Sequence, residues 1–207
     1  MRAEAPSAAW HNPLMRFLWM LVSLVLSTAA IAQQPPPSVN GNGDSDVGRA
    51  LQGNWAGYLE YRDYSEPPAS TKRVQLPTWL TVSQTSTGLS LHYIYDDGPG
   101  KVVDETEQIV FDVQHGICTI EESAHSAEVY HVEGFKSLRA GLGVLNMTGT
   151  GRDNDKSAEE CIALTIRRNI VERLLEARPA GSSEPYAFRH VFRLTRVQPP
   201  AVTASRE

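Results

Sequence analysis

Hydrophobic and polar residues alternate in short segments through most of this chain, and Gly, Pro and Asp residues separate the segments. Alternation with a period of two is typical of strands that bury one face, and frequent turn residues are typical of antiparallel hairpins. The strands that this pattern predicts span residues 51–62, 73–84, 89–95, 101–113, 117–122, 128–135, 142–150 and 186–197.

The segment 157–178 permits two interpretations. Ser157 and Glu160 have the spacing of a helix capping box, and apolar residues further along keep a helical spacing. Residues 161–168, however, alternate as a strand does, and Arg168-Asn169 could form a tight turn into a second strand. We favour the hairpin, and the helix stays open as the alternative.

With this hairpin, about nine or ten strands follow one another through short connections. Closing such a meander on itself removes the exposed strand edges that invite aggregation. We therefore expect an all-β domain over residues 47–197, built as an up-and-down antiparallel β-barrel. A β-sandwich is the alternative architecture.

The first residues have the pattern of a secretion signal. Met15-Arg16 is a positive start, residues 17–26 are apolar, and Ala30 and Ala32 have the A-x-A arrangement that signal peptidase requires. The apolar stretch is shorter than the roughly 20 residues that span a bilayer, so cleavage after Ala32 is favoured over a membrane anchor. Residues 1–32 are thus a predicted signal peptide, of which 1–14 is a possible upstream extension.

Export follows from this prediction, and we expect a periplasmic or secreted protein without a membrane span after cleavage. Residues 33–46 contain almost no apolar side chains, and their Gln, Pro, Gly and Asn residues predict a flexible linker. Residues 198–207 are predicted to be a disordered tail.

The charge balance limits the class of partner. The 19 basic and 24 acidic residues of the full chain become 17 and 23 once Arg2, Arg16 and Glu4 leave with the signal. An excess of acidic residues argues against nucleic acid as the main partner. We also expect a monomer.

Cys118 and Cys161 are the only cysteines, and export makes a disulfide between them chemically possible. Cys161 falls on the polar face of its predicted strand, whereas Cys118 shares a face with Ile120. The sequence therefore leaves both a bridge and two free thiols open.

Gly53-Asn54-Trp55 resembles the G-x-W motif of the lipocalin-like, or calycin, β-barrels. The wider region is similar to uncharacterised exported bacterial proteins of this type. In calycins the Trp closes the base of the barrel and packs against an Arg from the last strand. The resemblance therefore implies a structural role for Gly53 and Trp55, with Arg193 or Arg196 as the partner.

A barrel of this size holds either packed side chains or one small ligand. Its inward aromatic residues would favour a small apolar or aromatic guest, and packed core is the alternative role for the same residues. The candidate ligand-binding residues are Trp55, Tyr61, Tyr93, Tyr95, Phe111, Phe188, His190 and Phe192. No cofactor is predicted, and haem ligated by His190 is a minor alternative that rests on haem-binding calycins.

Catalytic motifs are missing from the sequence. It contains no Gly-x-Ser-x-Gly elbow, no P-loop, no His-Glu-x-x-His and no recognised metal-ligand spacing. We expect an exported, non-catalytic barrel that binds a small, partly apolar ligand. The alternatives are an envelope protein-interaction module with a filled barrel and a hydrolase with carboxylates at the barrel mouth. The acidic residues named for the second alternative are Asp63, Asp96, Asp97 and Asp104.

Overall fold

A computed structural model describes residues 46–67, 70–122, 126–153 and 156–197 of the chain. The predicted signal peptide, nearly all of the predicted linker, and the predicted tail lie outside the described residues. Asp46, the last residue of the predicted linker, begins the short helix α1 (Asp46–Leu51). Among the described residues, no helix has the length and apolar character needed to cross a membrane.

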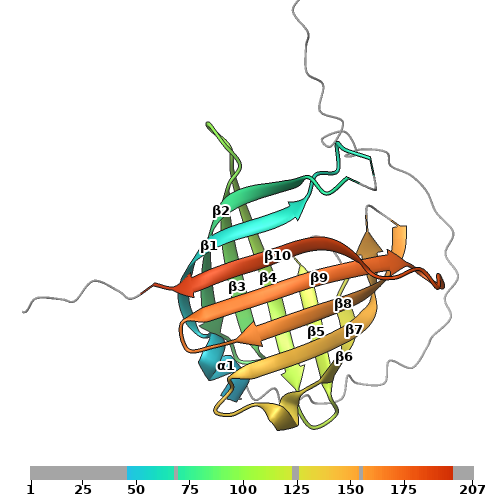
Figure 1. The fold of residues 1–207 in the computed structure, drawn as a ribbon. Coiled ribbons are helices and arrows are strands. Elements are labelled where there is room, and N and C mark those ends of the chain that lie inside the picture. Colours follow the sequence, from blue (N-terminus) through green and yellow to red (C-terminus); the bar gives the residue numbers. More distant parts are fainter. Residues whose placement is uncertain (1–45, 68–69, 123–125, 154–155, 198–207) are drawn as a thin grey trace, which may run out of the picture. The chain divides into compact units, whose positions relative to one another are not determined.

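Ten antiparallel strands follow α1 and close into a barrel (Figure 1). They are β1 (Gly53–Arg62), β2 (Arg73–Gln84), β3 (Leu89–Asp96), β4 (Val102–Asp112), β5 (Ile117–Glu122), β6 (Glu128–Glu133), β7 (Gly143–Asp153), β8 (Lys156–Ile166), β9 (Ile170–Pro179) and β10 (Ala187–Arg196). A 3-10 turn, η2 (Phe135–Ser137), lies between β6 and β7. The predicted up-and-down barrel is confirmed, and so is the β8–β9 hairpin, whereas the helix alternative for 157–178 is wrong.

Each strand pairs with its neighbours in the sequence, and the first strand pairs with the last. In that seam Trp55 lies opposite Arg196 and Tyr61 lies opposite His190. Because every strand has a neighbour on both sides, the sheet has no exposed edge for another chain to join.

The two ends of the barrel differ. The hairpins β2–β3, β4–β5, β6–β7 and β8–β9 turn at the end that holds α1, at the bottom of Figure 1. This closed end contains the apolar core. The β1–β2, β3–β4, β5–β6, β7–β8 and β9–β10 connections lie at the opposite end, which we call the mouth.

Trp55 and Arg196 close the base. Trp55 is 1% exposed and donates from Nε1 to the Leu51 carbonyl, 2.8 Å away. The Arg196 guanidinium lies 4.0 Å from the centre of the Trp55 ring and donates to the carbonyls of Ala50 and Gln52, each at 2.6 Å. Arg196 therefore holds α1 against the base, the position that the calycin resemblance implies for such an arginine.

Gly53 belongs to the same arrangement, because its φ of +124° favours glycine and a Cβ there would lie 2.7 Å from Arg196 Nη1. Arg193, the other arginine considered, is on the outer wall instead. It contacts Glu172 at 3.0 Å and Glu60 at 3.4 Å.

A β-bulge in β10 changes which side chains face inward. The register with β9 shifts between Phe188 and His190, so Arg189 and His190 both line the interior. Strict alternation along this strand predicts Phe188 on the same inner face as His190 and Arg189 on the opposite face, whereas the structure has Arg189 inside and Phe188 outside the cavity lining. Phe188 instead lies under the Arg73 guanidinium, 4.5 Å from its ring centre.

The two cysteines are free thiols. Cys118 is fully buried on β5, where burial raises the pKa of its thiol to about 12. Cys161 lies on β8, and β6 and β7 separate the two strands. Three strand spacings amount to about 14 Å, whereas a disulfide needs Cα atoms within about 7 Å. Of the two alternatives that the sequence leaves open, the structure therefore has the free thiols, and strand order is the reason.

Candidate functional site

A cavity of about 430 Å³ occupies the half of the barrel nearer the mouth. It reaches the rim at Tyr64 and Asp153. Residues from all ten strands and from the rim line it: Leu59, Tyr61, Tyr64, Leu76, Tyr95, Val103, Glu105, Glu107, Ile120, Glu122, Glu128, Tyr130, Arg152, Asp153, Glu160, Ile162, Arg173, Leu175, Ala177, Arg189, His190 and Phe192. The volume is within the range of small-molecule sites.

The lining is divided by chemistry around the barrel. Strands β1 to β3 contribute an apolar and aromatic wall of Leu59, Tyr61, Leu76 and Tyr95. Strands β4, β5, β6 and β8 contribute an acidic wall of Glu105, Glu107, Glu122, Glu128 and Glu160. Strands β9 and β10 contribute a basic wall of Arg173, Arg189 and His190.

An ion pair forms the floor of the cavity. Arg173 Nη1 on β9 donates to Glu107 Oε2 on β4, 2.6 Å away, and both side chains are close to nine-tenths buried. These strands lie opposite each other in the ring, so the pair crosses the whole interior. Burial by itself lowers the pKa of Arg173, but the charge of Glu107 more than offsets this and the pKa is raised.

A second polar cluster links the acidic wall. The Tyr130 hydroxyl lies 2.6 Å from Glu128 Oε2 and 2.7 Å from Glu160 Oε2. A phenol has one proton to donate, so it cannot satisfy two ionised carboxylates at once. Burial raises the pKa of Glu160, which is 4% exposed, and the charge of Glu128 adds to this effect. The ionised form of Glu160 is therefore less favourable than that of an exposed carboxyl group.

Two glycines of β7 make room for this cluster. A Cβ at Gly149 would lie 2.7 Å from the Tyr130 ring, and a Cβ at Gly151 would lie 2.5 Å from the Glu160 carboxyl group. Both positions lie inside the strand and not at its end, so their role is close approach and not a turn.

The basic wall contains buried donors without acceptors. Arg189 is 8% exposed and contacts Asp153 through Nη2 at 2.6 Å. Its Nε and Nη1, together with Arg173 Nε and His190 Nε2, have no hydrogen-bond partner among the described residues. Burial, with a smaller contribution from the charge of Arg173, lowers the pKa of His190 to about 3, so the imidazole is neutral at physiological pH. Buried polar atoms without a protein partner are rare in folded proteins, so these atoms are positions at which water or a polar ligand can bind.

The predicted ligand-binding residues divide into three groups. Tyr61, Tyr95, His190 and Phe192 line the cavity. Trp55, Tyr93 and Phe111 belong to the core beneath it, and Phe188 lies outside. The carboxylates named for a hydrolase do not meet in the cavity. Asp63 and Asp97 pair with lysines in their own mouth loops, and Asp104 pairs with His92 on the outer wall.

Sequence reasoning missed the charged lining, although the signal was present. Glu160 is in phase with Ile162 and Leu164 on β8, and Arg173 is in phase with Val171 and Leu175 on β9. A charged residue that continues the apolar phase of a strand faces inward. The same rule identifies Glu105, Glu107, Glu122 and Glu128 on their strands.

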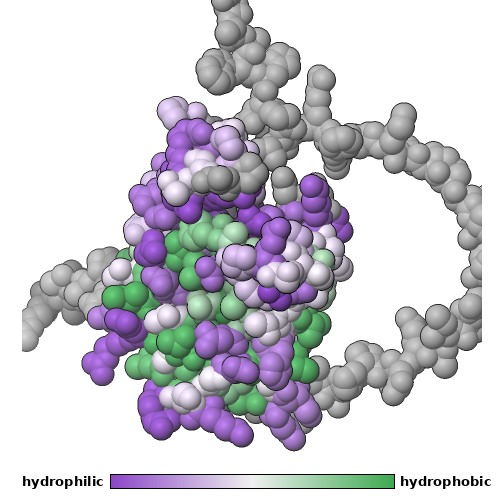
Figure 2. All heavy atoms as spheres, turned by 45° about the vertical axis from the view of Figure 1, so that its right-hand side comes forward, coloured by the Kyte–Doolittle hydropathy of each residue, from purple (hydrophilic) through white to green (hydrophobic). Residues whose placement is uncertain are grey.

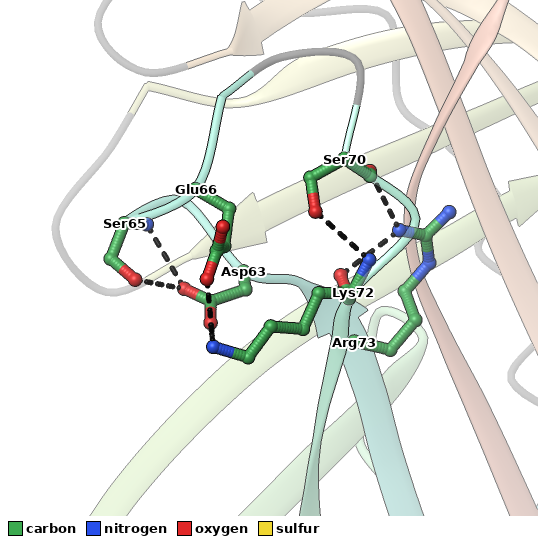
Figure 3. A network of polar contacts seen from close by, with 6 residues as sticks. All are labelled: Asp63, Ser65, Glu66, Ser70, Lys72 and Arg73. Carbon is green, nitrogen blue, oxygen red and sulfur yellow. Dashed lines mark hydrogen bonds and ion pairs between the residues drawn. The ribbon is translucent and has the colours of Figure 1, made fainter.

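The mouth is polar. Figure 2 shows hydrophilic side chains gathered over the upper part of the described surface, apolar ones across its middle and hydrophilic ones again along its lower edge. The β1–β2 connection is held by its own contacts (Figure 3): Lys72 Nζ lies 3.2 Å from Asp63 and 2.8 Å from Glu66. Asp63 also accepts from the Ser65 hydroxyl and backbone, which lowers the pKa of the carboxyl group.

The lining contains titratable groups, but the described residues include no cluster of three or more His, Cys, Asp or Glu arranged to hold a metal ion. Comparison with protein-family models, with curated proteins and with solved structures gives no match. What the chain's own geometry shows is a closed ten-stranded antiparallel barrel with a calycin-like Trp–Arg base and a charged cavity at its mouth.

Proposed function

We propose that this protein is an exported, non-catalytic barrel that binds a small, partly apolar ligand in the cavity at its mouth. One observation carries the proposal: the cavity combines an apolar wall with buried donors that lack partners. An apolar wall that stays in contact with water gives up favourable burial, and an unpartnered buried donor costs about 1–3 kcal/mol. A ligand with an apolar body and a polar end corrects both defects.

The cavity favours ligand binding over the filled-barrel interaction module. It also favours a polar small molecule over haem. A haem ligated by His190 would place an apolar ring system against Glu107, Glu160 and Arg173, and desolvating these groups without new partners is costly. Export is supported by the signal pattern of residues 1–32.

Native mass spectrometry of the full chain purified from its own host tests the proposal. We expect a protein peak with an added small-molecule mass that disappears under denaturing conditions. An absorbance spectrum of the same sample separates the two kinds of guest, because haem gives a Soret band and the proposed ligand does not.

A cavity-filling variant provides the matched test. In Leu175→Trp the new ring enters the cavity, whereas in Val144→Trp it lies on the outer wall at a position that is 45% exposed. The guest should be lost only from Leu175→Trp, with melting temperatures used to confirm that both variants fold. A guest that persists in Leu175→Trp, or the absence of any guest from the wild type, would overturn the proposal.

A further inference from the structure

The charged walls of the cavity specify the ends of the ligand, an inference that rests on the proposed ligand-binding function. Among the described lining residues, six carboxylates face three guanidiniums: Glu105, Glu107, Glu122, Glu128, Asp153 and Glu160 against Arg152, Arg173 and Arg189. A cavity with an excess of one charge, enclosed by apolar walls, attracts the opposite charge. The acidic wall therefore favours an ammonium group.

The Tyr130 cluster identifies where in the cavity an ammonium group would bind. Glu128 and Glu160 both contact the Tyr130 hydroxyl, which has one proton for two acceptors. An ammonium group has three N–H donors and would supply the ones that are missing.

The Tyr130 cluster lacks hydrogen-bond donors, whereas the basic wall lacks acceptors. Arg189 Nε and Nη1 and His190 Nε2 are buried donors or acceptors without partners among the described residues. Asp153 contacts only Nη2 of Arg189, so the other two nitrogens are available to a ligand carboxylate. Charge-assisted hydrogen bonds to a carboxylate are the strongest that a guanidinium makes.

The two positions are close enough for one small molecule. Glu160 on β8 and Arg189 on β10 are separated by β9 alone, which places their backbones two strand spacings apart, about 10 Å. Both side chains point into the cavity, which shortens the gap between their charged ends. The apolar wall of Leu59, Tyr61, Leu76 and Tyr95 faces them from β1 to β3.

We propose that the cavity binds a small zwitterion with an apolar side group, such as an amino acid or a close relative. Glu128 and Glu160 receive its ammonium group, Arg189 and His190 receive its carboxylate, and the wall from β1 to β3 receives its apolar part. Neither charged end is optional, because each one corrects a separate deficit in the lining.

Three probes that share one phenyl group test this inference by calorimetric titration: phenylalanine, 2-phenylethylamine and 3-phenylpropionate. The first carries both charged ends, the second the ammonium group alone and the third the carboxylate alone. We expect phenylalanine to bind at least about 10-fold more tightly than either of the others, the factor that one satisfied ionic contact provides.

Two variants test which residue binds each charged end of the ligand. Glu160→Gln should weaken phenylalanine and 2-phenylethylamine at least about 10-fold and leave 3-phenylpropionate unchanged. Arg189→Gln should weaken phenylalanine and 3-phenylpropionate and leave 2-phenylethylamine unchanged. Glu121→Gln and Arg167→Gln, at exposed positions outside the cavity, are the matched controls and should change nothing.

Equal binding of all three probes, or equal loss of all three in either variant, would overturn the zwitterion inference. So would the failure of all three to bind. That last result would leave the proposed function standing if native mass spectrometry still shows a guest. A wild type without any guest and without probe binding would overturn both.

Discussion

The closed end and the mouth of this barrel are built from the same strands but in opposite ways. At the closed end Trp55, Arg196 and α1 satisfy one another, and the side chains above them are apolar and buried. At the mouth the inward positions of the same strands carry charges, and several polar atoms have no partner. The difference teaches that one end stabilises the fold and that the other is arranged for a guest.

The largest effect should come from the base. Trp55→Ala removes a side chain that is 1% exposed together with its bond to Leu51, and large core truncations of this kind cost about 3–5 kcal/mol. Urea unfolding followed by circular dichroism measures the change. Trp79→Ala, at a position that is 48% exposed on the outer wall, is the control and should cost less than about 1 kcal/mol. Equal losses in the two variants would contradict the assignment of the base as the stabilising region.

In the ion pair that forms the cavity floor, removing one partner should cost much more stability than removing both. Arg173→Met leaves Glu107 buried without its partner, which costs about 3 kcal/mol. Glu107→Leu combined with Arg173→Met should recover nearly all of this loss, because two apolar side chains then fill the space. Urea unfolding of the single and double variants measures the coupling. A double variant as unstable as Arg173→Met would show that the charges themselves hold the barrel together.

Arg193 and Arg196 of β10 sharpen the comparison between inside and outside. Arg196→Ala removes three hydrogen bonds to backbone carbonyls and a cation–π contact, so we expect a loss of about 2 kcal/mol. Arg193→Ala removes ion pairs with Glu60 and Glu172 and a contact with the Tyr58 ring, all on the outer wall, and should cost no more than about 1 kcal/mol. Thermal melts of both variants decide the order, and the reverse order would remove Arg196 from the base.

The smallest effect concerns the pH dependence of the mouth. His190 has a lowered pKa, so below the ordinary histidine range the unfolded chain binds a proton that the folded protein does not. Its contribution to stability is present above that range and is lost as the pH falls, by about 1.4 kcal/mol over the first unit.

His190→Gln should lack this part of the acid sensitivity, and the exposed His131→Gln should keep it. Urea midpoints at pH 7 and pH 5.5 provide the measurement. Around His190 lie Arg173 on β9, Tyr61 on β1, and Arg189 and Phe192 on β10, and the charge that lowers its pKa further is that of Arg173. Parallel behaviour of the wild type and His190→Gln would contradict the buried, neutral imidazole.

Much of the fold could be predicted from the sequence because strands with short connections have few ways to pair. The alternation along 161–168, with a turn at 168–169, was enough to predict the β8–β9 hairpin. The base could also be predicted, because the resemblance of Gly53–Trp55 to the calycin motif implies an arginine partner from the last strand. The sequence left Arg193 and Arg196 as two candidates for this partner. The structure selects Arg196, because Arg196 faces inward opposite Trp55 and Arg193 faces outward.

The site was less accessible to the same reasoning. A charged residue in an alternating strand is ordinarily assigned to the solvent face, so Glu160 and Arg173 were passed over although their phase pointed inward. The bulge at Arg189 inserts one residue and reverses the facing of all residues before it. No local sequence pattern indicates that insertion. The alternation therefore predicts Phe188 inside the barrel, although it lies outside the cavity lining.

The seam between β1 and β10 has a consequence for how the chain reaches its folded state. β1 pairs with β2 on one side and with β10 on the other. Residues 53–62 therefore cannot complete their pairing until residues 187–196 are available. A chain that emerges from its N-terminus onward therefore carries an open sheet until its last strand arrives. Contacts so distant in sequence slow folding, and they make closure of the ring a late event that depends on the final tenth of the domain.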